Sequence, residues 1–505
     1  MYEINSIVSL LLTQISSVID RSGSKAYLVG GFVRDLLLKR DIADIDIAVS
    51  GDTFAIGREL ADVTSGSYVV LDEFTRVVRI VIPIGEKTYN LDIAPFAGDI
   101  ENDLGRRDFT INAVAISLQN VLSGSLKFID PYKGRNDLDK KVLRAVSDSI
   151  FRDDAARLLR AVRLSAELGL TIDAHTEELI SGHASLAATV SGERLREELL
   201  RIFALTDACK HIRYLDKVSL LTAIIPELQE MKSVEQPKEH YWDVFNHSVE
   251  MVATVEFILR DHTWRYAGDD LLAVMPWTDA IKKHFDERLS LESTRRTMMK
   301  LGALLHDVAK PQTKIVTDVG RTRFIGHAKQ GAAVAVDILT RLRFSGKEID
   351  FAESLVYNHL RPVQMANEGL PTNKAIYRYF RDTRDAGIDI LYFSLADYLA
   401  MCGPNVDMQE WQQHNTLISH ILAERYRQES QVLPVNLLDG NDLITLFDLS
   451  PGPVIGKLLV YVREAHVNGE IRSRDDAIAL VRKKLGDVKD KGYFSDTGCA
   501  ECACK

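Results

Sequence analysis

The chain has 505 residues, of which 46% are hydrophobic. This length and composition can supply several buried cores and predict about three or four domains. The formal net charge of −10 argues against a protein that coats nucleic acid nonspecifically, although a local basic patch could still hold a folded RNA. No stretch approaches the roughly 18 consecutive apolar residues of a membrane span, and the N-terminus carries no basic leader. We therefore expect a cytoplasmic protein without a membrane segment.

The cysteine spacing shows no disulfide framework. Cys209 and Cys402 are isolated, whereas Cys499, Cys502 and Cys504 crowd the C-terminal tail. The tail could bind a metal with help from other residues, but a disordered or merely reactive tail is the favoured interpretation.

Residues 1–145 mix short β-type runs with helical stretches, which predicts an α/β domain. The predicted strands cover residues 26–30, 44–50, 67–73, 77–84, 89–96 and 126–130. From about residue 150 the strand signals nearly vanish, and apolar residues recur at helical spacing. The predicted fold class is therefore an α/β N-terminal domain followed by an all-α body.

The segment AYLVGGFVRDLLLKRDIADIDIAVSGD, residues 26–52, carries the strongest chemical signal. A buried strand ending at Gly30 and Gly31 and launching a helix exposes backbone N–H groups, which suits the phosphates of a nucleotide. In the next strand, a period of two puts Asp44 and Asp46 on one face. Two such carboxylates repel each other unless a cation neutralises them, and Mg²⁺ is the usual one because it prefers oxygen ligands and bridges them to phosphates.

This arrangement favours nucleotidyl transfer, with Arg34 as a further triphosphate contact. The alternative is a solvated loop, which Gly-Gly alone would favour. Asp92 lies on another alternating strand and could supply a third carboxylate, or it could be an edge-strand solubility residue.

Further motifs follow in a fixed order. They are RRDFTINAVA (106–115), DPYKGRNDLDKKVLR (130–144), DDAARLLRAVR (153–163) and SGERLREELLRI (191–202). Together with the Gly-Gly-x-Val-Arg-Asp turn and the Asp-x-Asp strand, they resemble the bacterial-type (class II) tRNA nucleotidyltransferase and poly(A) polymerase family. The resemblance implies a polymerase beta-like nucleotidyltransferase domain that uses CTP and ATP with Mg²⁺ on the 3′ end of tRNA.

In RRDFTINA, two arginines precede what we predict to be a turn into a helix, and the resemblance implies that Arg107 contacts the nucleotide phosphates. A guanidinium fork suits phosphate oxygens. The alternative is a surface arginine paired with Asp108.

DDAARLLRAVR is predicted to be one helix, on which Asp154 and Arg157 are neighbours three residues apart. The resemblance implies that this pair selects the incoming cytosine or adenine by hydrogen bonds similar to base pairing. It also places Arg160 and Arg163 among nucleotide-binding positions, although Arg163 lies half a turn away from Asp154 and could instead brace the helix. The alternative for the whole run is a solvated face with a salt bridge from Asp153 to Arg157.

Only 13 residues, 93–105, separate Asp92 from Arg106. Many complete CCA-adding members of the family carry a longer loop here, and a short loop is typical of members that add only the two cytidines. A separate A-adding enzyme would then complete the tRNA end.

A second constellation is spread over the predicted helices. Its order resembles the HD phosphohydrolase superfamily and implies a divalent transition metal held by His247, His306, Asp307, His327, His359 and Asp397. Imidazole and carboxylate together suit such a metal, which could activate water against a phosphoester. The alternative is that these are core histidines.

The resemblance divides the chain into five segments. They are a catalytic domain (1–145), a helical nucleotide- and RNA-binding domain (146–230), an HD domain (231–425), a C-terminal helical tRNA-binding segment (426–490) and the Cys-rich tail (491–505). The rival functions are a poly(A) polymerase, an HD phosphohydrolase with an RNA-sensing N-terminal domain, and a pure RNA-binding module, for which paired metal carboxylates would be needless.

Overall fold

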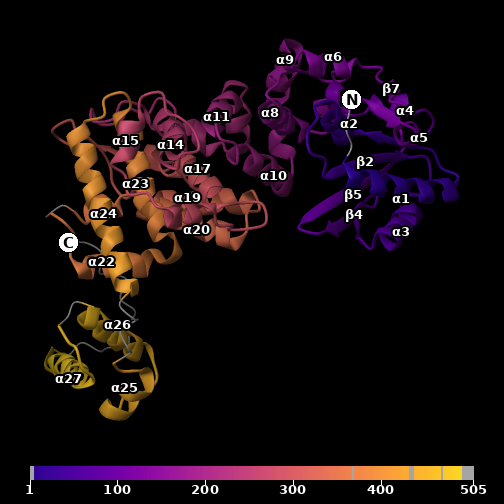
Figure 1. Ribbon diagram of the computed structural model, residues 1–505. Coiled ribbons are helices and arrows are strands. Elements are labelled where there is room, and N and C mark those ends of the chain that lie inside the picture. The colour runs from indigo at the N-terminus through magenta and orange to yellow at the C-terminus, as the bar shows by residue number, and fades with distance from the viewer. Residues whose placement is uncertain (1–4, 367–368, 431–436, 468–469, 492–505) are drawn as a thin grey trace. The chain divides into compact units, whose positions relative to one another are not determined.

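The computed structural model describes residues 5–366, 369–430, 437–467 and 470–491. The chain forms two compact units, whose residues can be found in Figure 1 by the colour that marks residue number. The first comprises Met1–Glu230 with Arg341–Phe344, and the second comprises Met231–Thr340 with Ser345–Lys505. Among the described residues, no helix is both long and apolar enough to cross a bilayer. The Cys-x-x-Cys-x-Cys tail lies outside the described residues.

The first unit is built on a seven-stranded sheet with the order β3-β4-β5-β2-β1-β6-β7. Its strands are β1 Ala26–Val29, β2 Asp44–Val49, β3 Ser67–Asp72, β4 Val77–Ile84, β5 Lys87–Pro95, β6 Ala115–Ser117 and β7 Phe128–Ile129. All neighbours pair antiparallel except β2 and β5, which are parallel. The six strands expected from the sequence are present. β6 was not expected, because its short apolar run directly follows the RRDFTINA motif.

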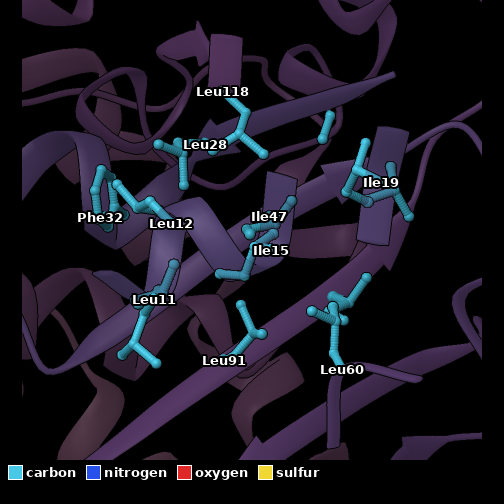
Figure 2. Packing of buried hydrophobic residues seen from close by; sticks show 14 of the residues in the cluster. Leu11, Leu12, Ile15, Ile19, Leu28, Phe32, Ile47, Leu60, Leu91 and Leu118 are labelled. Carbon is cyan, nitrogen blue, oxygen red and sulfur yellow. The ribbon is translucent and has the colours of Figure 1, made fainter. Parts of the chain in front are cut away.

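The core of this unit lies between the sheet and helices α1 (Ser6–Ser22) and α3 (Thr53–Thr64). Figure 2 shows Ile15 of α1 beside Ile47 of β2, in a cluster of buried residues that also contains Leu11 of α1 and Leu28 of β1. Ile45 and Ile47 are fully buried, as the alternation of β2 predicts. The burial of Ile45 and Ile47 fixes the register of β2, because a shift of one residue would point the carboxylates of this strand into the core.

Short helices connect the strands. They are α2 Gly30–Leu37, α4 Ile100–Leu104, α5 Leu118–Leu122, α6 Gly134–Asp139 and the 3₁₀ turn η1 Thr110–Asn112. The expectation that RRDFTINA turns into a helix was wrong. A single 3₁₀ turn at Thr110–Asn112 leads directly into β6, which pairs with β1.

The rest of the first unit is helical apart from a small parallel pair, β8 (Val142–Leu143) with β9 (Thr171–Ile172). Its helices are α7 Ile150–Asp153, α8 Arg157–Leu168, α9 Ala174–His183, the 3₁₀ helix η2 Ala184–Thr189, α10 Gly192–Phe203, α11 Ala208–Lys217, α12 Leu220–Ile224 and α13 Glu227–Met231. The prediction of one continuous helix over 153–163 was wrong, because Asp154 has an extended backbone (φ −152°, ψ 104°) that separates α7 from α8.

In the residues that the structure describes, the regular structure of the second unit is helical apart from one hairpin, β10 (Lys314–Val316) and β11 (Thr322–Phe324). Its helices up to residue 358 are α14 Val244–Ile258, α15 Asp269–Ala273, α16 Asp279–Asp286, α17 Arg295–Leu305, α18 Lys310–Thr313, α19 His327–Arg341 and α20 Gly346–Asn358. Those that follow are α21 Arg361–Gln364, α22 Asn373–Thr383, η3 Arg384–Ala386, α23 Gly387–Cys402, α24 Met408–Ser430, α25 Gly440–Phe447, α26 Pro453–Val467 and α27 Arg474–Lys491.

Candidate functional site

The first candidate site lies where β2 meets the start of α2. Asp44 is exposed and Asp46 is half-buried on the same face of β2. Asp92 of the neighbouring parallel strand stands opposite Asp46 in the register, so three carboxylates share this part of the sheet. β5 lies between β4 and β2, so the alternative that Asp92 sits on an edge strand was wrong.

The carboxylates differ in their partners. Arg79 donates two hydrogen bonds to Asp92, of 2.6 and 2.7 Å. Asp46 is partly withdrawn from water, and this burial, together with the nearby charge of Asp92, raises its pKa. Because burial and like charge both disfavour the ionised form, a cation bound here would restore it. Carboxylate oxygens are the ligands that a hard divalent ion prefers, so the residues fit such an ion.

The Gly-Gly turn approaches the carboxylates closely. The N–H of Gly31 donates a 2.8 Å hydrogen bond to Asp46 Oδ2. Gly30 has a φ of +62°, and a Cβ at this position would lie 3.0 Å from both Arg107 Nη1 and Asp46 Oδ2. Glycine is therefore required both for the left-handed backbone and for the space that the two charged groups occupy.

Arg107 is fixed in this corner by an acidic partner. Asp103 of α4 accepts hydrogen bonds from Arg107 Nε and Nη2 at 3.1 and 2.9 Å. Arg107 does not pair with Asp108, so this alternative from the sequence was wrong. Asp108 is buried and accepts a 2.7 Å hydrogen bond from Arg160.

Arg34 has mainly internal contacts. Its guanidinium donates to Asp35 beside it and, at 2.9 Å, to Asn112 Oδ1 of η1. Its side chain is only 13% exposed. Arg34 therefore braces α2 against η1 next to the Gly-Gly turn.

The residues of the DDAARLLRAVR motif surround the break between α7 and α8. Asp154 Oδ2 lies 3.9 Å from Arg157 Nε, so the two are neighbours as predicted, although Asp154 is not helical. Arg157 also donates to the carbonyl oxygen of Arg106 at 2.9 Å. Asp153 accepts instead from the Ser149 hydroxyl, at 2.8 Å.

Arg163 is buried away from this group. Its guanidinium pairs with Glu198 of α10 and with Glu167 of its own helix, and its side chain is 4% exposed. Arg163 therefore braces α8 against α10. This agrees with the alternative drawn from the sequence, in which Arg163 lies half a turn away from Asp154.

The second candidate site joins residues from five segments of the second unit. His247 lies on α14, His306 and Asp307 follow α17, His327 opens α19, His359 follows α20 and Asp397 lies on α23. Asp307 shares one tight group of possible ligand atoms with His247 and His306, and another with His327 and His359. Asp397 Oδ1 lies 3.0 Å from His247 Nε2 and so belongs to the same centre.

The orientation of the imidazoles is set by the backbone. In His306, His327 and His359, Nδ1 lies 2.7–2.8 Å from the carbonyl oxygen three residues earlier. Nδ1 therefore carries the proton, and the lone pair of Nε2 is left for another partner. His327 Nε2 is buried and has no hydrogen-bond partner among the described residues. An orphaned imidazole nitrogen beside the buried carboxylate of Asp307 and the partly exposed one of Asp397 fits a divalent metal, and a candidate metal group is thus present.

A cavity of about 1290 Å³ opens beside this centre and is lined by Asp307, His327, His359 and Asp397. Two further lining residues escaped the sequence analysis. Lys310 Nζ lies 2.6 Å from Asp307 Oδ2. The sequence could have indicated Lys310, because it follows Asp307 by three residues, and residues three apart on one helical turn are neighbours.

The other residue that the sequence analysis missed is His240, whose buried Nδ1 has no partner among the described residues. Burial lowers the pKa of His240 to about 4. It precedes α14 by a few residues, and no sequence signal distinguishes it from the nearby polar residues.

Three family profiles match the chain. They are described as the poly A polymerase head domain (residues 26–144), the probable RNA and SrmB-binding site of polymerase A (169–232) and the HD domain (244–402).

Two curated relatives match about nine-tenths of the chain, and a third matches less than half of it. The A-adding tRNA nucleotidyltransferase of Deinococcus radiodurans is 32% identical over 91% of this chain and 95% of its own length. The CC-adding tRNA nucleotidyltransferase of Thermus thermophilus is 31% identical over 90% of this chain and 93% of its own length. The CCA-adding enzyme of Geobacillus thermodenitrificans is 36% identical over only 42% of this chain and 53% of its own length.

Solved structures share the fold. A CCA-adding enzyme in an apo form gives a TM-score of 0.62 at 18% identity and covers 97% of both chains. The Thermotoga maritima CCA-adding enzyme complexed with tRNA gives a TM-score of 0.58 at 21% identity, covering 96% of this chain and 97% of its own. The match in sequence over nine-tenths of the chain, together with the ordered motifs and the HD domain, means that the chain belongs to the bacterial-type (class II) tRNA nucleotidyltransferase and poly(A) polymerase family.

Proposed function

We propose that this protein adds C or A nucleotides to the 3′ end of tRNA without a template, using CTP or ATP and Mg²⁺. The observation that supports this most directly is the corner formed by Asp44 and Asp46, the Gly30-Gly31 turn and Arg107. These parts give a nucleoside triphosphate its metal carboxylates, a turn whose Gly31 N–H holds Asp46 in place, and a fixed guanidinium for its phosphates.

The roles of the residues follow from these contacts. Asp44 and Asp46 would hold Mg²⁺, which supplies charge to neutralise the phosphates and the leaving pyrophosphate. The Gly31 turn and Arg107 would fix the triphosphate, so that the tRNA 3′-hydroxyl can attack the α-phosphate in line. Arg160 and Arg34 keep Asp108 and Asn112 in place behind this corner.

Base selection is assigned to Asp154 and Arg157. A carboxylate only accepts hydrogen bonds and a guanidinium only donates them. The pair therefore complements an exocyclic amino group next to a ring nitrogen acceptor, which cytosine and adenine both present. The carbonyl groups of uracil and guanine would face the carboxylate and be repelled.

The short segment 93–105 supports addition of only part of the CCA sequence. It is organised by α4, and Asp103 of α4 holds Arg107 in place. A segment tied to the phosphate-binding arginine leaves little freedom to change the site between C and A. Three curated relatives that match over about nine-tenths of the chain carry CC-adding or A-adding names, which agrees with this restriction.

The test is single-nucleotide incorporation on tRNAs ending at the discriminator base, at C and at CC, each with CTP, ATP or both. Addition that stops after two cytidines, or addition of A to the CC end alone, would support a specialised enzyme. Completion of CCA would contradict the restriction assigned to residues 93–105. Long adenosine tails on unrelated RNA would favour the rival poly(A) polymerase.

A second activity is supported by the His-Asp centre. A divalent transition metal bound by His247, His306, Asp307, His327, His359 and Asp397 would make water a stronger nucleophile toward a phosphoester. The cavity beside it is large enough for a nucleotide-sized substrate. A phosphate left on a tRNA 3′ end is a substrate that fits, because its removal exposes the hydroxyl that nucleotide addition requires.

A further inference from the structure

Arg194 makes the strongest contact of the base-selecting carboxylate. It lies on α10 and donates to both oxygens of Asp154, from Nη1 to Oδ1 at 2.9 Å and from Nη2 to Oδ2 at 2.7 Å. Such a two-bond pairing between a planar guanidinium and a carboxylate fixes the plane of the carboxylate as well as its position.

The contacts of Asp154 leave a defined place for a ligand. A carboxylate offers about four acceptor positions. Oδ1 accepts from Arg194 and, at 3.1 Å, from the N–H of Ala156. Oδ2 accepts from Arg194, and its nearest further cation is Arg157, 3.9 Å away. The remaining acceptor position of Asp154 therefore belongs to Oδ2, the oxygen nearest to Arg157.

We infer that Arg194 is a specificity-determining positioning residue, which orients Asp154 so that one acceptor position beside Arg157 is left to select an amino group on the incoming base. The inference rests on the proposed base selection by Asp154 and Arg157 and deepens it.

The local backbone makes such a clamp necessary. Asp154 sits in the extended break between α7 and α8, so no helical turn holds its side chain. Its side chain is 30% exposed, which leaves it open to a ligand and also free to rotate without a partner. Arg194 is carried on a twelve-residue helix, a more rigid support than the break itself.

A second contact anchors α10 to the same motif. Glu198, one turn after Arg194, pairs with Arg163 and lies 4.0 Å from Arg160. Since residues four apart share a helical face, α10 docks on α8 through Glu198 and reaches the selecting carboxylate through Arg194. The docking contact and the orienting contact are thus made by different side chains.

The protonation state of Asp154 depends on the same clamp. Burial raises the pKa of Asp154, but the hydrogen bonds and charge of Arg194, with the Ala156 N–H and Arg157, outweigh it and hold the pKa below its usual value. Loss of Arg194 would raise the pKa. A protonated Asp154 carries a donor and could pair with the O4 carbonyl of uracil, so discrimination would also become dependent on pH.

The test uses the full chain with Arg194→Lys and Arg194→Met, and with Arg201→Lys as the matched control, an exposed arginine on the same helix. The nucleotides are compared in two pairs, CTP with UTP and ATP with inosine triphosphate. In each pair, the first base carries an amino group and the second a carbonyl group at the position that Asp154 would contact. Both incorporation into tRNA and equilibrium binding without tRNA are measured, and thermal melting checks the fold. Lysine keeps the charge but cannot form the two-bond fork, so it separates orientation from charge.

We expect both Arg194 variants to lose at least about tenfold of the discrimination between amino and carbonyl bases, while the affinity for the correct nucleotide changes little. In Arg194→Met, UTP incorporation should rise further between about pH 7 and about pH 5, whereas the wild type and Arg201→Lys stay level.

Unchanged ratios in both Arg194 variants, or an equal loss for all four nucleotides, would overturn the inference. If Arg194→Met fails to fold, Arg194→Lys decides it. A wild-type protein that transfers no nucleotide to tRNA would contradict the proposed function, while the binding ratios would still test the clamp.

Discussion

The two candidate sites are built in opposite ways. The site in the first unit draws its carboxylates from adjacent strands, leaves them partly exposed and pairs the surrounding arginines with acidic side chains. The site in the second unit gathers buried imidazoles, the buried Asp307 and the partly exposed Asp397 from five segments, and three of its rings are held by backbone carbonyls. The first arrangement suits a charged ligand that enters and leaves, and the second suits a resident metal.

The largest effect should follow from removing a metal carboxylate of the first site. Asp44→Ala should reduce nucleotide addition on the order of 10³-fold, because a metal contributes several kcal/mol to stabilising the transition state. Asp44 is exposed, so the melting temperature should stay the same. Incorporation of CTP or ATP on tRNA measures the loss, and Asp41→Ala, an exposed aspartate just before β2, is the control. Activity retained by Asp44→Ala would refute the metal assignment.

Breaking the second site should leave the first one working. Asp307→Asn keeps the shape of the side chain but removes the charge that both ligand groups share. We expect at least about a hundredfold weaker binding of divalent transition metal, since even partners of metal ligands contribute about 10- to 100-fold. Metal content after dialysis and hydrolysis of a simple phosphate ester measure the effect.

The exposed Glu353→Gln on α20 serves as its control. Nucleotide addition should be unchanged in both variants. If Asp307→Asn binds metal as well as the wild type does, the histidines are core residues and the second site is not a metal site.

The first site was more predictable from the sequence because its parts lie close together in the chain. The alternation of β2 fixes Asp44 and Asp46 by local geometry, and Gly30 and Gly31 are the first two residues of α2. Arg79 and Arg194 could not be predicted, because the pairing partner of a charged side chain depends on tertiary packing.

The errors in secondary structure have the same cause. Helical spacing continues through Asp154, yet its backbone is extended, since Asp154 bonds to the following N–H of Ala156 and to Arg194. Aspartate favours such local bonds over the helix. β6 was missed because its three residues become a strand only through pairing with β1.

A smaller effect should distinguish bracing from nucleotide binding at Arg163. Arg163→Met removes the closest cationic partner of Glu198 and Glu167, which should lower the free energy of unfolding by about 2–3 kcal/mol. The loss is smaller than for a fully buried pair, because Arg160 lies 4.0 Å from Glu198 and Glu167 is partly exposed. Hydrogen exchange of α8 and α10 measures this locally. The affinity for CTP should stay within about twofold of the wild type. A large loss of affinity with unchanged exchange would instead make Arg163 a ligand-binding residue.

The smallest effect concerns the pH dependence of the second unit. Burial lowers the pKa of His414 to about 4, and the ring stays buried against the Ser394 hydroxyl, 3.1 Å from Nε2. Its folded pKa lies below the unfolded value of about 6.5, so its contribution to stability is complete above that pH and is lost as the pH falls toward 4. The loss amounts to at most about 3 kcal/mol.

In the wild type, the free energy of unfolding should fall as the pH drops from about 7 to about 5, because His414 takes up a proton on unfolding. His414→Gln cannot take up this proton, so the decrease should be smaller by about 1–2 kcal/mol. All four tryptophans, at positions 242, 264, 277 and 411, lie in the second unit, so their fluorescence during urea unfolding reports this unit alone. The effect should also be visible in protein dialysed free of metal, because His414 is not among the candidate ligands. An equal pH slope in the wild type and His414→Gln would mean that the imidazole is accessible to protons in the folded protein, and that this wall of the cavity is open to water.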